Sequence, residues 1–198
     1  LYRLMKSHRR SAQVLRVIGG QWRSRRLEFP DLPGLRPTPD RVRETLFNWL
    51  APVLPGACCL DLFAGSGALG IEALSRGAAQ VVFVERHSLA VRTLRDNLDR
   101  LHARNARIDQ AEALTWLCSP GTPFDIVWLD PPFGEGLLAP TCARLEQGGW
   151  LAATAWIYLE AEAGQPPPLL PPHWTFHREK IAGMVAYRLV RRNMLALT

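Results

Sequence analysis

No apolar run in the 198-residue sequence approaches the about 20 residues that a helix needs to cross a bilayer. The first ten residues, LYRLMKSHRR, also lack the apolar stretch of a secretory signal, so we expect a cytoplasmic protein. Only four cysteines are present, and no two of them have C-x-x-C spacing. His173 and His177 lie four residues apart, but Pro171 and Pro172 argue against a helix that would make them a ligand pair. We therefore expect buried, reduced thiols and no metal site.

Acidic residues are absent from residues 1–27, which hold eight of the 24 Lys and Arg residues. The rest of the chain carries slightly more acid than base, so the whole excess behind the net charge of +6 lies in this N-terminal arm. Such an arm is the electrostatic footprint of a polyanionic partner. A solubilising tail is the alternative for residues 1–10. Residues 14–22, VLRVIGGQW, instead predict a strand, a Gly-Gly turn and a second strand.

The segment TPDRVRETLFNWL, residues 38–50, has the pattern of an amphipathic helix. Thr38 is a suitable N-cap, and Pro39 suits the first helical position. We expect four side chains to form the buried stripe: Val42, Leu46, Trp49 and Leu50.

From residue 57, short apolar runs alternate with amphipathic stretches, which is typical of an α/β fold whose parallel sheet is covered by helices on both faces. The expected strands are residues 58–63, 81–85, 107–109, 124–130 and 155–160. The expected helices between them are residues 69–76, 89–101, 112–117 and 137–145. Two later strands, about 174–181 and 184–191, are separated by Gly183 and predict a C-terminal hairpin.

A glycine-rich loop, GSGALG at residues 65–70, lies between a predicted strand and a predicted helix, as nucleotide-binding loops do. Gly65 and Gly67 allow the backbone to approach a ligand closely. Glu85 ends the next strand, where a carboxylate can accept hydrogen bonds from both ribose hydroxyls. NAD and S-adenosylmethionine share this adenosine, so the loop leaves both cofactors open.

Asp61 distinguishes the two cofactors. It ends the first strand, four residues before Gly65. A carboxylate there opposes the pyrophosphate of a dinucleotide and favours a cation. S-adenosylmethionine carries an ammonium and a sulfonium and no phosphate, so Asp61 favours the methyl donor. A helix-capping or turn role is the structural alternative.

The strand FDIVWLD, residues 124–130, breaks into Pro131, Pro132 and Phe133. The Asp130 carboxylate and the Pro131 carbonyl can both face a ligand as hydrogen-bond acceptors, and Phe133 adds an aromatic face. Two acceptors and a ring suit a planar exocyclic amine. The carboxyl end of a central strand is also where this fold class binds its ligands.

These segments resemble known methyltransferase motifs. Residues 61–67, DLFAGSG, are similar to motif I of class I S-adenosylmethionine-dependent methyltransferases, and residues 130–133, DPPF, to their [DN]-P-P-[FYW] motif of amine methylation. More narrowly, RVIGGQWR (16–23), GLRPTPDRVRETLFN (34–48) and HREK (177–180) resemble the bacterial 16S rRNA guanine-N2 methyltransferases of the RsmD type. The resemblance covers roughly residues 14–191. It implies a seven-stranded Rossmann-like sheet with a small N-terminal β-hairpin, and methylation of one guanine in the 16S rRNA of an assembling small ribosomal subunit.

The resemblance also implies site residues. Asp130, Pro131, Pro132 and Phe133 would hold the target amine and base. S-adenosylmethionine would be bound by seven residues: Asp61, Phe63, Gly65, Gly67, Glu85, Glu112 and Ala113. Glu112 is longer than the Asp or Asn often found at its position in such motifs, which leaves its adenine contact open.

For RNA, we expect residues 1–34 to form a binding extension and residues 35–198 the methyltransferase domain of a monomer. The expected RNA contacts are Arg16, Trp22, Arg23, Arg25, Arg26, Arg36, Arg41 and Arg43. Packing of Trp22 on the domain, and pairing of Arg41 or Arg43 with Glu44 or Asp40, are the alternatives.

Three other functions fit parts of the pattern. Amine methyltransferases that act on DNA adenine or on a protein glutamine share the D/N-P-P-F/Y motif, although the basic arm disfavours a protein substrate. A non-catalytic RNA-binding assembly factor would keep the fold, but Asp61, Glu85 and residues 130–133 are intact. An NAD-dependent oxidoreductase is disfavoured by Asp61 and by the lack of an evident site for hydride chemistry.

Overall fold

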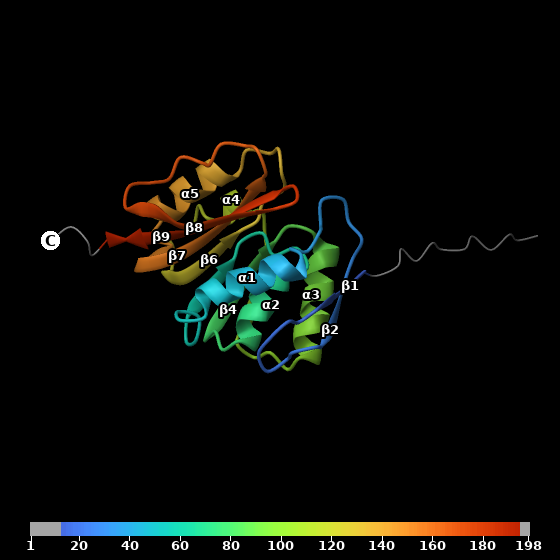
Figure 1. Cartoon of the computed structure of the whole chain (residues 1–198). Helices are drawn as coiled ribbons and strands as arrows, with labels where there is room; N and C mark the ends of the chain where they lie inside the picture. Colours follow the sequence, from blue (N-terminus) through green and yellow to red (C-terminus); the bar gives the residue numbers. More distant parts are fainter. Residues whose placement is uncertain (1–12, 195–198) are drawn as a thin grey trace, which may run out of the picture.

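The apolar runs after residue 57 form one seven-stranded sheet in the order β5-β4-β3-β6-β7-β9-β8 (Figure 1). The computed structural model describes residues 13–194. Five neighbouring strands are parallel: β3 (Cys58–Asp61), β4 (Gln80–Glu85), β5 (Ala106–Gln110), β6 (Phe124–Leu129) and β7 (Leu151–Glu162). The last two, β8 (Trp174–Ala182) and β9 (Val185–Asn193), form the predicted antiparallel hairpin, and β9 pairs with β7.

Helices cover both faces of the sheet, as the alternating pattern predicts. On one face lie α1 (Asp40–Leu50), α2 (Ala68–Ser75) and α3 (Ser88–Arg100), whose apolar side chains share one core cluster with Phe83, Trp128 and Tyr158. On the other face lie α4 (Ala113–Trp116) and α5 (Leu138–Gln147), which pack with Leu60, Val127 and other residues of a second cluster. The strands are buried between these layers because both of their faces are apolar.

Helix α1 begins at Asp40, with Pro39 at the N-cap position and no side-chain cap. The expectation that Thr38 caps the helix is therefore wrong. Thr38 is 5% exposed, and its side chain instead forms hydrogen bonds with the carboxyl groups of Asp130 and Glu160. Val42, Leu46 and Leu50 are buried as predicted; Trp49 is half-buried and stacks on Tyr187 of β9.

The N-terminal hairpin is present but its turn lies elsewhere than predicted. β1 (Gln13–Arg16) pairs with β2 (Arg26–Phe29), so residues 17–25 form the connection. Gly19 and Gly20 are not the turn between the strands; they lie against the end of α2. A Cβ on Gly20, where φ is +76°, would lie 1.9 Å from the Ser75 carbonyl oxygen. Glycine is needed here for close approach to the helix.

In the part of the chain that the structure describes, no helix is long and apolar enough to cross a membrane. Cys59 and Cys142 are buried free thiols, as expected, whereas Cys58 is half-buried, and Cys118 is exposed and accepts a hydrogen bond from Arg144.

Candidate active site

The carboxyl ends of the adjacent strands β3 and β6 border a cavity, and residues 34–38, between the hairpin and α1, form its opposite wall. Four residues predicted to bind the cofactor or the target amine line it together, namely Asp61, Phe63, Gly65 and Asp130. The remaining lining comes from residues 34–38, which include Arg36, and from Ala64, Ser66, Ala68 and Leu69. The glycine loop and the end of β6 therefore meet in one place, as predicted.

Asp61 is 3% exposed at the end of β3. Its Oδ2 accepts a hydrogen bond of 3.0 Å from the backbone N–H of Gly70 in the first turn of α2, so it also has the helix-capping role that was the alternative. Burial raises the pKa of Asp61 to about 7, and the nearby Glu85 charge adds to this, while the Gly70 hydrogen bond opposes it. A buried carboxylate with a raised pKa gains most from a cationic ligand.

The glycine loop is held in shape from two sides. Gly67 has φ of +76°, and a Cβ there would lie 2.3 Å from Cδ1 of Leu94 in α3. Glu85, at the end of β4, accepts hydrogen bonds from the backbone N–H groups of Gly65 at 2.8 Å and His87 at 2.7 Å. Glu85 thus fixes the loop and keeps further lone pairs on its carboxylate. Gly67 and Glu85 are not part of the cavity lining.

Glu112 and Ala113 lie after β5, away from the lining of the cavity. Glu112 is exposed and caps α4, because its Oε2 accepts a 2.9 Å hydrogen bond from the Thr115 backbone N–H. Ala113 is buried in the second core cluster. Their contact with adenine stays a prediction.

Asp130 belongs to a network of polar side chains that the sequence did not reveal. Its carboxyl group is hydrogen-bonded to Glu160 of β7 and to Thr38. The hydroxyl of Tyr158 donates a 2.6 Å hydrogen bond to Oε1 of Glu160. Burial raises the pKa of Asp130 well above its usual range, and the adjacent Glu160 raises it further. Two carboxyl groups joined by a hydrogen bond hold one proton between them. The signal in the sequence was the acid in the otherwise apolar run WIYLE.

The residues after Asp130 differ in exposure. Pro131 is buried and Pro132 is half-buried. Phe133 is 44% exposed, which leaves its ring available to a ligand.

Of the eight predicted RNA contacts, six have exposed side chains: Arg16, Arg23, Arg25, Arg26, Arg36 and Arg41. The other two are corrected by the structure. Trp22 is 9% exposed and lies in the first core cluster, so it packs on the domain and is not available to stack on a base. Arg43 is 1% exposed and bonded within the protein, so it does not face a phosphate.

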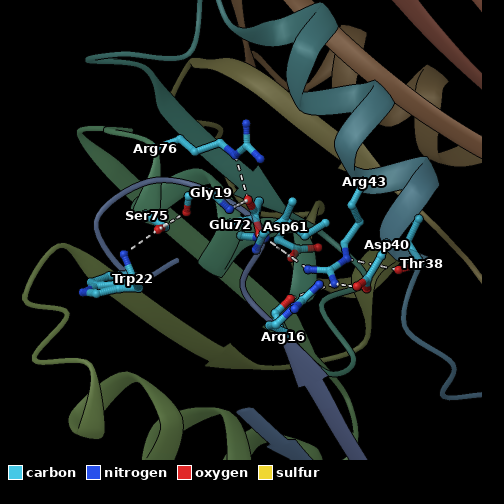
Figure 2. Close-up of polar contacts among 12 residues, drawn as sticks. Arg16, Gly19, Trp22, Thr38, Asp40, Arg43, Asp61, Glu72, Ser75 and Arg76 are labelled. Atoms are coloured by element: carbon cyan, nitrogen blue, oxygen red, sulfur yellow. Dashed lines mark hydrogen bonds and ion pairs between the residues drawn. The ribbon is translucent and has the colours of Figure 1, made fainter. Parts of the chain in front are cut away.

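Figure 2 shows what holds Arg43 in place. Its guanidinium forms an ion pair with Asp40 at 2.6 Å, donates to the Arg16 carbonyl at 2.9 Å and to the Thr38 carbonyl at 3.2 Å, and lies 3.5 Å from Glu72. Arg43 therefore connects α1 with the end of β1 and with the segment that walls the cavity.

Glu72, fully buried in α2, ties the connection between β1 and β2 to this helix (Figure 2). Its two oxygens accept hydrogen bonds from the backbone N–H groups of Ile18 at 2.9 Å and Gly19 at 2.8 Å. Arg76, one turn later, donates to Glu72 at 2.7 Å. Ser75 completes the junction: its hydroxyl donates to the Gly19 carbonyl and accepts from the Trp22 N–H. The connection is thus fixed on α2 by specific polar contacts.

Within residues 13–194, no group of three or more His, Cys, Asp or Glu side chains is arranged to hold a metal ion.

Comparisons with known proteins agree with this geometry. Residues 15–191 match the model of the family described as Conserved hypothetical protein 95. Ribosomal RNA small subunit methyltransferase D of Escherichia coli strain K12 is 55% identical over 186 residues, which are 94% of this chain and 93% of that protein. The Haemophilus influenzae protein of the same name is 44% identical, over 88% of this chain and 92% of its own length. The solved structure of the Escherichia coli protein yhhF has a TM-score of 0.87 and 54% identity, and the match covers 92% of this chain and 99% of that chain.

Proposed function

Because the chain belongs to the Conserved hypothetical protein 95 family, in which it matches small-subunit ribosomal RNA methyltransferases, we propose that it methylates the N2 amine of one guanine in 16S rRNA with S-adenosylmethionine as donor. The observation that carries the proposal is the meeting of Asp61 and Asp130 in one cavity. One carboxyl group there suits a cationic donor, and the other suits an amine.

The residues of the cavity fit S-adenosylmethionine. The buried Asp61 carboxylate would pair with its ammonium, and Phe63 and Gly65 would lie along the methionine and ribose. Glu85, next to Gly65, would accept the ribose hydroxyls, and Glu112 and Ala113 would lie near the adenine. When bound, S-adenosylmethionine supplies a methyl group made electrophilic by its sulfonium.

For the reaction, the Asp130 carboxylate and the Pro131 carbonyl would accept hydrogen bonds from the two N–H groups of the guanine amine. This arrangement directs the nitrogen lone pair at the methyl carbon. Methyl transfer would form the N–C bond at the expense of the donor's S–C bond, and the surplus proton would pass from the nitrogen to water. Asp130 also stabilises the positive charge that develops on the nitrogen. Phe133 would stack on the base, which must be unpaired or flipped to enter the cavity.

The six exposed arginines would bind the RNA backbone. Arg23, Arg25 and Arg26 lie on the hairpin that Glu72 fixes to α2, whereas Arg36 borders the cavity. The remaining two are Arg16 and Arg41. Residues 1–34 would act as the RNA-binding extension of a methyltransferase domain formed by residues 35–198, although residues 1–12 lie outside the described part. We place the enzyme in the cytoplasm, as a monomer acting on an assembling small subunit.

The test is to incubate the purified protein with methyl-labelled S-adenosylmethionine and small ribosomal subunits from cells that lack the activity. After digestion, mass spectrometry identifies the modified nucleoside. N2-methylguanosine at one site supports the proposal. Asp130→Ala should abolish the label, and normal turnover by this variant would contradict the mechanism. Label that appears only on duplex DNA or on a release-factor-like protein would overturn the substrate.

A further inference from the structure

Beyond α1, the sheet face that carries the hairpin and the cavity wall continues onto β7, β9 and β8 (Figure 1). Five residues there, Trp156, His177, Arg178, Lys180 and Arg191, form what we call the edge surface. All but the half-buried Trp156 are exposed. The proposed RNA contacts above include none of them, although three belong to the HREK segment that the sequence singles out.

Strand register places these residues on one face. Trp156 pairs with Arg191, which pairs with Thr175, and Tyr158 pairs with Leu189, which pairs with Arg178. Glu160 pairs with Tyr187, which pairs with Lys180. Directly paired residues of neighbouring strands share a face of the sheet. The irregularity between Phe176 and Arg178 inserts His177, whose ring lies edge-on to Trp156 at 4.9 Å.

The edge surface is basic and its cations are free of acidic partners. Within residues 13–194, no ion pair engages Arg178, Lys180 or Arg191. The acid of the same strand, Glu179, faces the opposite way and pairs with Arg188. Arg191 lies over the Trp156 ring at 5.5 Å, which orients its guanidinium and leaves the N–H donors for an anion.

The position of the edge surface relates it to the cavity. Lys180 and Glu160 pair with the same residue of β9, so Lys180 lies two strands from Glu160, or about 10 Å at the usual strand spacing. Glu160 is in turn hydrogen-bonded to Asp130. The basic hairpin packs beside α3, toward the edge of the sheet formed by β5, whereas β8 forms the other edge. The target base would therefore enter between two basic regions on the same face.

Resting on the proposed function, we propose that the edge surface binds the phosphate backbone of the substrate RNA on the flank of the target guanine opposite the hairpin. Arg178, Lys180 and Arg191 have no acidic partner among the described residues and lie near the proposed RNA site, so their charge is complementary to that of the RNA phosphates. Charges on an edge strand also block strand-to-strand aggregation. That role is indifferent to the sign of the charge and does not account for Arg191, which lies on the interior strand β9.

The test compares the wild-type enzyme with Arg178→Ala/Lys180→Ala, using small ribosomal subunits that lack the modification. Both side chains are exposed, so the fold should tolerate their loss. We expect the KM for subunits to rise several-fold at physiological salt, while kcat at saturating subunits and the KM for S-adenosylmethionine stay unchanged. The slope of log affinity against log salt should become shallower by about two, one for each lost phosphate contact.

The matched control is Arg104→Ala/Arg144→Ala, which removes the same charge from two exposed residues, one in the loop before β5 and one on α5 at the other face. Equal KM values for the two double variants would overturn the inference while the proposed function stands. A raised KM with an unchanged salt slope would assign the surface to a ribosomal protein and also overturn it. Failure of the wild-type enzyme to methylate any RNA would instead overturn the proposed function.

Discussion

At the scale of single residues, the proposed chemistry depends on the pH range in which three buried acids are protonated. Asp61, Asp130 and Glu160 lie at or near the carboxyl ends of neighbouring strands, and each has a raised pKa because burial disfavours its charge. The proposed roles of Asp61 and Asp130 both require the charged form. Activity should therefore be lost in acid, and the pKa of each group sets where.

Removing the charge of Glu160 should extend activity to lower pH. Glu160→Gln keeps a hydrogen-bonding side chain beside Asp130 but removes the negative charge that raises the pKa of Asp130. Because Asp130 must be deprotonated to accept the amine, the acidic limb of the kcat/KM profile should move to lower pH at saturating S-adenosylmethionine. Glu162→Gln, two residues further along the same strand, is the control and should leave the limb in place. An unmoved limb in Glu160→Gln would show that the pair does not set the protonation of Asp130.

Ligand binding should measure the protonation of Asp61 separately from that of Asp130. Its pKa of about 7 means that S-adenosylhomocysteine, whose ammonium needs the carboxylate, should bind about ten-fold more weakly for each pH unit well below 7. Calorimetry between pH 5 and 8 measures this. 5′-Methylthioadenosine lacks the ammonium and is the matched ligand, so its affinity should stay nearly constant. An equal pH dependence for both ligands would remove Asp61 as the ammonium partner.

The same shift has a consequence for the unliganded protein. Between the ordinary value of 3.8 and about 7, the folded state keeps a proton on Asp61 that the unfolded state has lost. The contribution of Asp61 to stability therefore falls as pH rises through this window. A ligand that pairs with the carboxylate should restore it.

At the scale of elements, the connection between β1 and β2 joins the proposed RNA-binding hairpin to α2, the helix that follows the glycine loop. Gly20→Ala would place a Cβ 1.9 Å from the Ser75 carbonyl oxygen at a φ of +76°. We expect a loss of at least about 1 kcal/mol in the free energy of unfolding, and a raised KM for RNA because the connection that carries Arg23 and Arg25 must move. The KM for S-adenosylmethionine should change less. Steady-state kinetics and chemical denaturation measure the three quantities.

Gly56→Ala is a control that introduces backbone strain without a clash between the new Cβ and a neighbouring residue. Gly56 has a similar φ of +79°, but a Cβ there meets no atom within 4 Å. This variant should lose stability without any rise in the KM for RNA. If it raised that KM as much as Gly20→Ala does, the contact with α2 would not be the cause.

The same junction shows the limit of prediction from sequence. Strand ends are local features of an apolar pattern, so the places of Asp61 and Asp130 could be predicted. Arg43 and Glu72 lie 29 residues apart in the chain, and Glu72 and Gly19 lie 53 apart. Their pairing depends on how α1, α2 and the connection pack together. For that reason Arg43 was mistaken for an RNA contact and Gly19 for part of a hairpin turn.

At the scale of the whole molecule, the strand order places the cavity. The chain moves outward from β3 to β4 and β5 and then returns to the other side of β3 with β6. In such sheets the ligand crevice opens where the order reverses, outside the carboxyl ends of the strands. The segment 34–38 then closes the crevice from the side of α1, a contact that no local pattern predicts.

The two proposed RNA surfaces lie on opposite sides of this crevice, so their contributions to binding should be independent. Arg23→Ala/Arg25→Ala on the hairpin and Arg178→Ala/Lys180→Ala on the edge surface share no partner, and their changes in the free energy of binding should add within about 0.5 kcal/mol in the quadruple variant. Binding of unmethylated 16S rRNA at fixed salt measures the cycle. An RNA shortened on one flank of the guanine should lose sensitivity to one pair of substitutions and keep sensitivity to the other. Strong non-additivity, or an RNA end that matters to both pairs, would mean that one stretch of backbone visits both surfaces and that the target guanine does not enter between them.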